Sequence, residues 1–154
     1  MKKKILIFAA ICGLIGLFFL VDCLVLQFYT VDIVSISPET SVADGKTPVT
    51  ITFSVKKNGQ PVEGHILYML SKSCGSLKSN RIATNTKGEA EFVYYPYLAS
   101  NYLKAGDVML RVEDESNSIF VSVPASKDFT VKLTDPASTS NTEPDYLTDD
   151  IFGE

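Results

Sequence analysis

Apolar and polar residues alternate in short runs through most of the chain after residue 30. The clearest run is 49–55 (VTITFSV), in which aliphatic or aromatic residues alternate with Thr and Ser. A period of two is typical of a strand with one buried and one solvated face. Asn58-Gly59 follows closely, and this dipeptide strongly favours the tight turn of a hairpin.

The same alternation recurs along the chain and predicts about seven strands. They cover residues 31–36, 49–56, 65–70, 90–95, 108–113, 119–123 and 129–133. Lys87-Gly88 and the polar stretch 113–118 indicate turns between strands. No segment after residue 30 has the apolar face of a helix. Short strands with frequent turns are typical of an antiparallel β-sandwich, so the pattern predicts an all-β fold.

The N-terminal segment has a different pattern. Residues 5–29 carry no charge except Asp22, and they follow the lysines at positions 2–4. About 20 apolar residues are enough for a helix to cross a membrane, and flanking lysines stay in the cytoplasm. The sequence predicts a single-pass plasma membrane protein with its N-terminus in the cytoplasm. Its parts are a cytoplasmic basic stub (1–4), a transmembrane signal anchor (5–29), an extracytoplasmic domain (30–133) and a disordered acidic tail (134–154).

Two other fates of this segment remain open. The run LVDC at residues 20–23 resembles a lipoprotein processing site, which would place a lipid on Cys23. Asp22, however, stands where a small residue is usual in such sites. The second alternative is cleavage and secretion, for which an A-x-A-like site would be needed near the end of the run.

Asp22 lies near the outer end of the predicted span. A charge is costly at the centre of a bilayer and less costly near its surface. One interpretation is that Asp22 reaches outward to headgroups and water. The other is a membrane helix contact, in which Asp22 pairs with a polar group on a partner helix. Ala9 with Gly13, and Cys12 with Gly16, are spaced to permit close approach of such a helix.

Charge and cysteine content exclude several classes of function. Residues 30–133 carry 11 acidic and 11 basic side chains, and residues 134–154 carry 6 acidic side chains and no basic one. A neutral domain with an acidic tail lacks the basic face that nucleic-acid binding needs. Only Cys74 lies outside the apolar run, so no disulfide forms within the domain and no cysteine metal site is built. We expect no metal and no cofactor.

Four motifs occur in order in the β-rich part. They are ADGKTPVT at 43–50, KNGQPVEG at 57–64, CGSL at 74–77 and TNTKGEA at 84–90. Their sequence and spacing over residues 35–133 resemble bacterial Ig-like domains of the invasin/intimin type. The resemblance implies an immunoglobulin-like antiparallel β-sandwich of about seven strands, preceded here by one transmembrane helix.

This resemblance implies more about fold than about role. Such domains usually occur in tandem arrays and act as stiff spacers in surface adhesins. This sequence has one copy, with an apolar segment in place of an outer-membrane barrel. Function resides in sites and not in folds, so the adhesin role does not follow from the fold.

In the predicted strand at 65–70, both alternating sets of residues are apolar, so neither face of the strand is polar. If Leu67 and Met69 face the core, then Ile66, Tyr68 and Leu70 face outward. A contiguous apolar surface is typical of a binding surface. The alternative is coverage by the chain's own loops or by the C-terminal segment.

Tyrosines are concentrated between residues 94 and 102. Tyrosine offers rigid contact area with a hydrogen-bonding tip, which suits protein or glycan partners. Tyr95, Tyr97 and Tyr102 are therefore candidates for partner binding. The alternative is a long crossover packed by its own aromatic side chains, including Tyr94.

The tail offers a further candidate. Residues 144–152 mix acidic and apolar residues, and Tyr146 and Phe152 would anchor a short motif that orders on a partner. A solvated tail is the alternative. The single histidine, His65, has no nucleophile motif and is interpreted as structural. The acidic run 113–115 is interpreted as solvated, with calcium binding as the alternative.

These observations predict a non-enzymatic protein. We expect a membrane-anchored accessory or structural subunit that mediates protein–protein interaction in a bacterial cell-envelope assembly, with another envelope or membrane protein as partner. The alternative is a surface adhesin or a glycan or cell-wall binding module. An enzyme would require a positioned acid–base set, which the sequence does not indicate.

Overall fold

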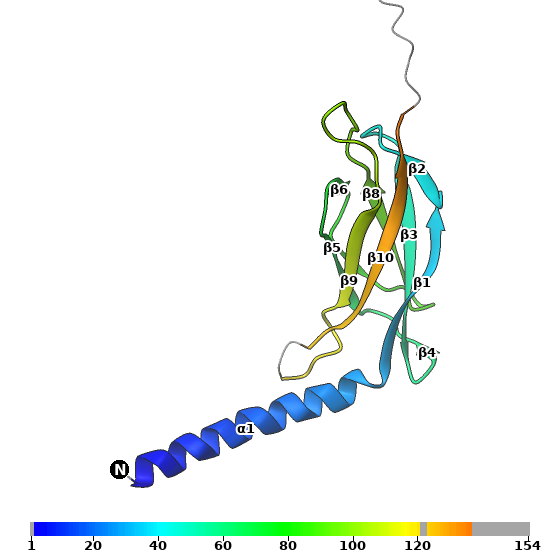
Figure 1. The fold of residues 1–154 in the computed structure, drawn as a ribbon. Helices are drawn as coiled ribbons and strands as arrows, with labels where there is room; N and C mark the ends of the chain where they lie inside the picture. The colour runs from blue at the N-terminus through cyan, green and yellow to red at the C-terminus, as the bar shows by residue number, and fades with distance from the viewer. Residues whose placement is uncertain (1, 121–122, 137–154) are drawn as a thin grey trace, which may run out of the picture.

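The computed structural model describes residues 2–120 and 123–136 (Figure 1). Within this part the chain forms helix α1 (Lys2–Leu26) and ten strands. The strands are β1 (Tyr29–Ser37), β2 (Thr40–Val42), β3 (Val49–Lys57), β4 (Gln60–Pro61), β5 (Ile66–Ser71), β6 (Ser76–Leu77), β7 (Arg81–Ala83), β8 (Glu89–Tyr95), β9 (Val108–Asp114) and β10 (Ala125–Thr134).

The described strands form two sheets. One has the order β1-β3-β8-β6, with the short β4 also paired to β3, and the other has the order β2-β10-β9-β5-β7. Neighbouring strands are antiparallel, except that β2 pairs with β10 in parallel. The predicted all-β sandwich, preceded by an N-terminal helix, is confirmed.

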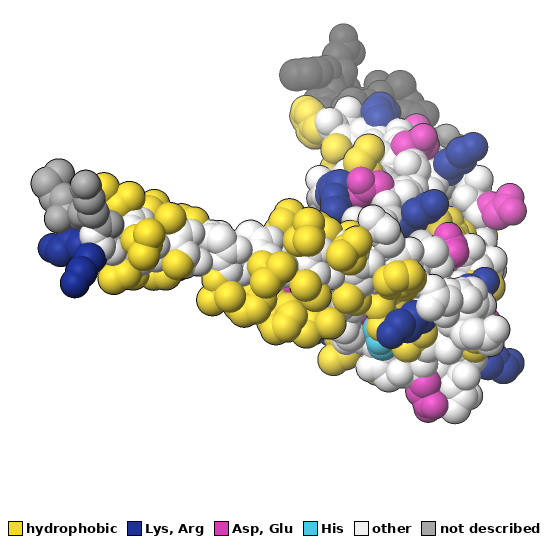
Figure 2. Space-filling model, turned by 90° about the horizontal axis from the view of Figure 1, so that it is seen from below, with side chains coloured by type: hydrophobic (Ala, Val, Ile, Leu, Met, Phe, Trp, Pro, Cys, Tyr) yellow, Lys and Arg dark blue, Asp and Glu magenta, His cyan; other side chains and the backbone are white. Residues whose placement is uncertain are grey.

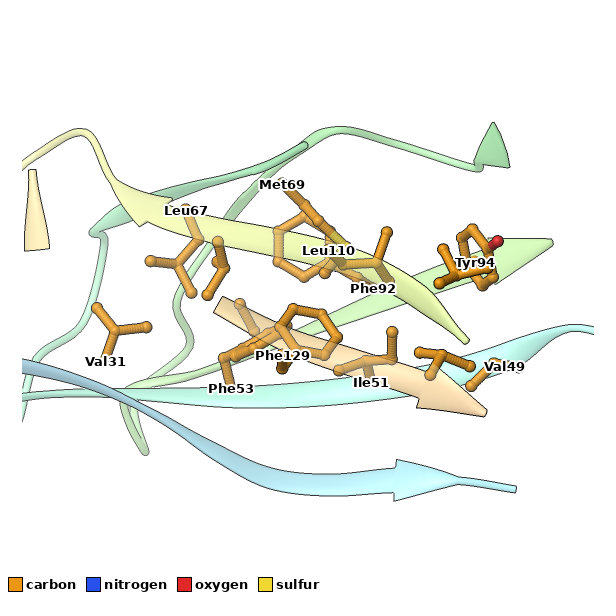
Figure 3. Close-up of a cluster of buried hydrophobic side chains, with 14 of the residues drawn as sticks. Val31, Val49, Ile51, Phe53, Leu67, Met69, Phe92, Tyr94, Leu110 and Phe129 are labelled. Carbon is orange, nitrogen blue, oxygen red and sulfur yellow. The ribbon is translucent and has the colours of Figure 1, made fainter. Parts of the chain in front are cut away.

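Alternate residues of the long strands meet between the sheets to form the core (Figure 3). The Phe53 ring lies edge-on to Phe92 of its own sheet and to Phe129 of the facing sheet, with centroids 5.8 Å and 5.3 Å apart. Burial of each large apolar side chain stabilises the fold by about 1.5–3 kcal/mol. Other buried members are Val31, Val49, Ile51, Leu67, Met69, Tyr94 and Leu110.

Six of the predicted strands correspond to β1, β3, β5, β8, β9 and β10. The predicted strand at 119–123 is wrong, because Ile119 and Phe120 lie in the loop between β9 and β10. Their backbone N–H groups bind Asp22 of α1 instead of a neighbouring strand. Strands β2, β4, β6 and β7 have two or three residues each, too few for a period of two to be recognised in the sequence.

Gly75 shows why the CGSL motif requires glycine. Its φ is +98°, and the ring of Tyr94 lies directly against its Cα. A Cβ at this position would lie 2.5 Å from Cε2 of Tyr94. The Tyr94 hydroxyl donates a hydrogen bond of 2.8 Å to the Cys74 carbonyl, which ties this turn to β8.

Helix α1 runs crosswise to the long axis of the sandwich and leaves it at one end (Figure 1). The described C-terminal residues lie at the opposite end. By length and composition α1 is able to cross a membrane, with a mean hydropathy of 2.6 and only 6% of its apolar window buried. A signal sequence has the same properties, so these values alone do not distinguish the two.

Candidate functional site

Asp22 is a buried acidic residue at the point where α1 meets the sandwich. Its side chain is 1% exposed. Oδ1 accepts hydrogen bonds from the backbone N–H groups of Ile119 and Phe120 at 3.0 Å and 3.1 Å, and Oδ2 accepts a second one from Phe120 at 3.0 Å. The interpretation that Asp22 reaches outward to headgroups and water is wrong, because the chain's own loop encloses the carboxylate. Contact with a partner helix stays a prediction.

Phe18 lies one turn before Asp22 on the same face of α1. Its ring stacks on Phe120, with centroids 4.6 Å apart and an interplanar angle of 15°. We call Phe18, Asp22, Ile119 and Phe120 the Asp22 clasp. The two halves of the clasp are 97 and 98 positions apart in the chain, so no local pattern indicated it.

Hydrogen bonds within the β9–β10 loop fix the segment that carries Ile119 and Phe120. Buried Asn117 donates from Nδ2 to the Val123 carbonyl at 3.1 Å and accepts the Ala125 N–H at 2.9 Å. Ser118 Oγ accepts the Val123 N–H at 2.7 Å. The two arms of the loop are thus joined behind Ile119 and Phe120.

His65 lies at the same end of the sandwich, just before β5. Its Nδ1 is 2.7 Å from Oδ2 of Asp114, which is fully buried, and its ring lies 5.2 Å from that of Tyr29. Asp114 Oδ1 also accepts the Ser116 N–H at 2.9 Å. The interpretation of run 113–115 as solvated is therefore wrong for Asp114. The ring contacts of His65 join β5 to β9 and β1, which is a structural role.

The outward face of β5 is not an open apolar patch. Leu67 and Met69 are buried and Ile66 is exposed, as the alternation predicted. The Arg81 guanidinium, however, lies 4.3 Å from the centroid of the Tyr68 ring. Arg81 in turn donates two hydrogen bonds of 3.0 Å to Glu115. Tyr68 is thus covered by a charged pair from β7 and the β9–β10 loop, whereas Leu70 is half-buried.

The structure separates the tyrosines instead of gathering them. Tyr94 is buried in the core, and Tyr95 is half-buried on the outer side of the same strand. Tyr97 donates its hydroxyl hydrogen to the Lys104 carbonyl at 2.8 Å. Tyr102 is 101% exposed. Tyr146 and Phe152 lie outside the described residues.

Tyr102 stands on the loop at residues 96–107, which joins β8 to β9 at the end of the sandwich away from α1 (Figure 1). We call it the far-end loop. Leu98 and Leu103 are the other large apolar side chains exposed on it. Ser100 Oγ accepts the N–H groups of Tyr102 and Leu103 at 3.3 Å and 3.2 Å.

Two more contacts fix the base of the far-end loop. The Ala99 N–H donates to the Ala43 carbonyl at 2.8 Å, and the Ala105 N–H donates to Asp135 Oδ1 at 2.9 Å. The loop is therefore held by hydrogen bonds to other parts of the chain at both of its ends. A surface hollow of ≈ 400 Å³ lies beside the loop and is lined by Ala99, Ser100, Asn101, Lys104, Asp135 and Pro136.

Asp44 closes the turn beside this loop. Hydrogen bonds from the Thr47 hydroxyl, the Thr47 N–H and the Lys46 N–H lower the pKa of Asp44 from 3.8 to about 2. Asp44 also forms an isolated β-bridge with Leu98. Within residues 2–120 and 123–136, no three His, Cys, Asp or Glu side chains come together as a metal site would require.

The comparisons with known proteins concern the fold. No protein-family model matches the sequence, and no curated protein is significantly similar to it. Among solved structures, the D00–D0 domains of intimin match with a TM-score of 0.51 and 21% identity, covering 67% of this chain and 47% of that one. The sandwich has the intimin type of Ig-like fold. The present chain thus spans about half of that intimin fragment.

Two further solved structures are similar at lower TM-scores. A C-terminal 282-residue fragment of intimin, in complex with the intimin-binding domain of the translocated intimin receptor, has a TM-score of 0.48 and 22% identity, with coverage of 66% and 33% of the two chains. A conjugative transposon lipoprotein from Bacteroides eggerthii has a TM-score of 0.41 and 20% identity, with coverage of 67% and 95%. At these identities the likeness concerns fold alone.

Proposed function

We propose that this protein is a non-enzymatic accessory or structural subunit of a bacterial cell-envelope assembly. Helix α1 anchors it in the plasma membrane, and its Ig-like domain binds another envelope or membrane protein outside the cytoplasm. The observation that carries this proposal is the position of the apolar helix at one end of the sandwich and of the far-end loop, with its exposed apolar side chains, at the other.

The contacts of α1 support an anchor over a removable signal. Most side chains of the helix are apolar and exposed on every side, which suits a lipid environment. Its last turns, by contrast, are part of the domain through the Asp22 clasp. Cleavage before residue 30 would leave Phe120 without its stacking partner and would remove the acceptor of two backbone N–H groups.

The far-end loop supports partner binding. Tyr102, Leu98 and Leu103 are large exposed apolar side chains. The backbone of the first and third is fixed by hydrogen bonds to Ser100 Oγ. Ordering a loop on association costs free energy, and a loop that is already ordered avoids most of that cost. The hollow beside it ends at Pro136, from which the acidic tail with Tyr146 and Phe152 continues. Loop and tail thus form the proposed binding end.

The test is the native mass of the full-length protein, extracted from its own membranes in mild detergent, with its companions identified. We expect a reproducible complex, and we expect the double substitution Tyr102→Ser with Leu103→Ser to lose the companions. The matched control is Met109→Ser, which also removes an exposed apolar side chain but lies on β9. A lone monomer, or equal recovery of companions with both variants, would contradict the proposal.

A second candidate is a surface adhesin or glycan-binding module. The fully exposed Tyr102 favours it, because an aromatic ring is a common platform for sugars and protein ligands. Because the structure separates the tyrosines, the adhesin or glycan-binding candidate rests on the Tyr102 ring alone. Binding of cell-wall polymer or glycan by the protein, lost in Tyr102→Ala and retained in Tyr97→Ala, would support this candidate over the first.

A further inference from the structure

We propose that Ile119 and Phe120 of the β9–β10 loop form a second membrane-inserted element and enter the apolar layer of the bilayer beside α1. The proposal rests on the membrane anchoring of α1 proposed above. The Asp22 clasp favours this insertion, because the Asp22 carboxylate and the N–H groups of Ile119 and Phe120 become hydrogen-bond partners inside the protein.

The depth of the clasp follows from the helix geometry. Asp22 lies 18 residues after Lys4, about 27 Å along the axis at about 1.5 Å per residue. The hydrocarbon core of a bilayer is about 30 Å thick. With Lys4 at the cytoplasmic boundary, Asp22 lies about 3 Å inside the outer boundary and Phe18 about 9 Å inside it. Phe120 stacks on Phe18 with ring centroids 4.6 Å apart, so its ring lies within that distance of the same depth.

Irregular backbone is excluded from lipid unless its N–H and C=O groups have partners. Asp22 supplies the acceptor for the N–H groups of Ile119 and Phe120, which is the donor half of this requirement. A carboxylate within the hydrocarbon layer is equally costly without partners, and Asp22 is 1% exposed and enclosed by the same loop. The helix carboxylate and the two loop N–H groups therefore replace the water that each would lose on entering the bilayer.

The outer surface of the clasp is apolar. Ile119 is 61% exposed and Phe120 is 55% exposed. Leu24 and Phe28 are further exposed apolar side chains at this end of α1. Figure 2 shows apolar side chains gathered around the end of α1 where it meets the domain. This surface is continuous with the lipid-facing surface of the helix, so the bilayer is the occupant that covers both.

Residues just beyond the clasp mark the headgroup level. Tyr29 begins β1 immediately after the helix, and the Lys57 ammonium lies 5.1 Å from the centroid of its ring. Tyrosine and lysine are typical of the interfacial zone of a membrane. Tyr29 and Lys57 thus suit the headgroup level just outside the hydrocarbon layer.

The chain has no tryptophan, so one introduced tryptophan reports its own surroundings. Full-length Phe120→Trp is reconstituted in vesicles of phosphatidylcholine and phosphatidylglycerol, with or without bromine on the acyl chains. We expect blue-shifted emission and quenching by brominated lipid comparable to that of Leu14→Trp, in the middle of α1. Ile119→Trp repeats the measurement with the Phe18–Phe120 stack intact. Val34→Trp, exposed on β1, is the control that should resist quenching by lipid.

The two proposals fail in different ways. If Leu14→Trp is quenched by brominated lipid and neither loop variant is, the loop stays outside the hydrocarbon layer and the present inference is overturned. If Leu14→Trp is not quenched either, α1 does not span the membrane, and the proposed anchoring fails with it.

The role of Asp22 is tested by Asp22→Leu in the Phe120→Trp chain. Leucine makes α1 more apolar, so helix insertion is retained, while the acceptor for the loop N–H groups is lost. We expect most of the lipid quenching at position 120 to disappear and the emission to shift to the red. The control Asp32→Asn, at an exposed position on β1, should leave both unchanged. Unchanged quenching in Asp22→Leu would show that the clasp does not hold the loop in the bilayer.

Discussion

The turn at Gly75 gives a prediction whose magnitude follows from the structure. In Gly75→Ala, a residue with a Cβ must adopt a φ of +98°, which costs about 1–2 kcal/mol. The new Cβ also overlaps the buried Tyr94 ring, and overpacking of this kind costs about 1–3 kcal/mol. We therefore expect a loss of about 2–5 kcal/mol of unfolding free energy. Such a loss is a large fraction of the stability of a small domain.

The matched control is Gly59→Ala. Gly59 also has a positive φ, +81°, but an added Cβ there has no heavy atom within 4 Å. The backbone strain and the effect of alanine on the unfolded chain are shared by both variants, so their difference isolates the overlap with Tyr94. We expect Gly75→Ala to be less stable than Gly59→Ala by about 1–3 kcal/mol.

The assay is urea unfolding of the full-length protein in mild detergent, followed by far-ultraviolet circular dichroism. With an m-value of about 1–2 kcal/mol/M, the two midpoints should differ by about 0.5–3 M. Equal midpoints would refute the reasoning, because they would mean that Tyr94 does not lie against Gly75. Replacing Tyr94 by Leu should reduce the cost of Gly75→Ala, because the two residues then no longer overlap.

Three further predictions concern other parts of the sandwich. Asn117→Ala should lower the unfolding free energy by about 2–3 kcal/mol, because a buried N–H and a carbonyl lose their partners; an unchanged urea midpoint would contradict this. The pKa of Asp44 falls from 3.8 to about 2 on folding, so its contribution to the unfolding free energy is present above pH 4 and is lost as pH falls towards 2. In Asp44→Asn, the unfolding free energy should therefore depend less on pH between 4 and 2. Burial raises the pKa of Tyr94 from 10.0 to about 12, so stability should fall between pH 10 and 12, and Tyr94→Phe should show a smaller fall over that range.

The strands were predictable because their signal is local. A period of two in the sequence places one face of each long strand in the core, and Leu67 with Met69 follow this rule. The apolar helix was predictable from composition alone. The glycine motifs also indicated the right turns, since a positive φ leaves little choice of residue at Gly75 and Gly88.

The candidate surfaces were less predictable. Tyr68 has the right alternation for an exposed side chain, yet Arg81 from β7 covers its ring. The strand expected at 119–123 has the right composition, but backbone hydrogen bonds to a helix residue replace those to a neighbouring strand. In both places a contact between segments distant in the chain overrides the local pattern.

The sequence by itself determined that an apolar helix precedes an antiparallel sandwich, because both follow from hydrophobic periodicity over a few neighbouring residues. Only the tertiary structure decided that Asp22 is enclosed by the β9–β10 loop, that Tyr94 is buried while Tyr102 is fully exposed, and that the helix and the far-end loop lie at opposite ends. These features depend on which segments meet in space. The physical reason is that burial and hydrogen-bond partners are set by the whole fold, whereas strand and helix patterns are set by adjacent residues.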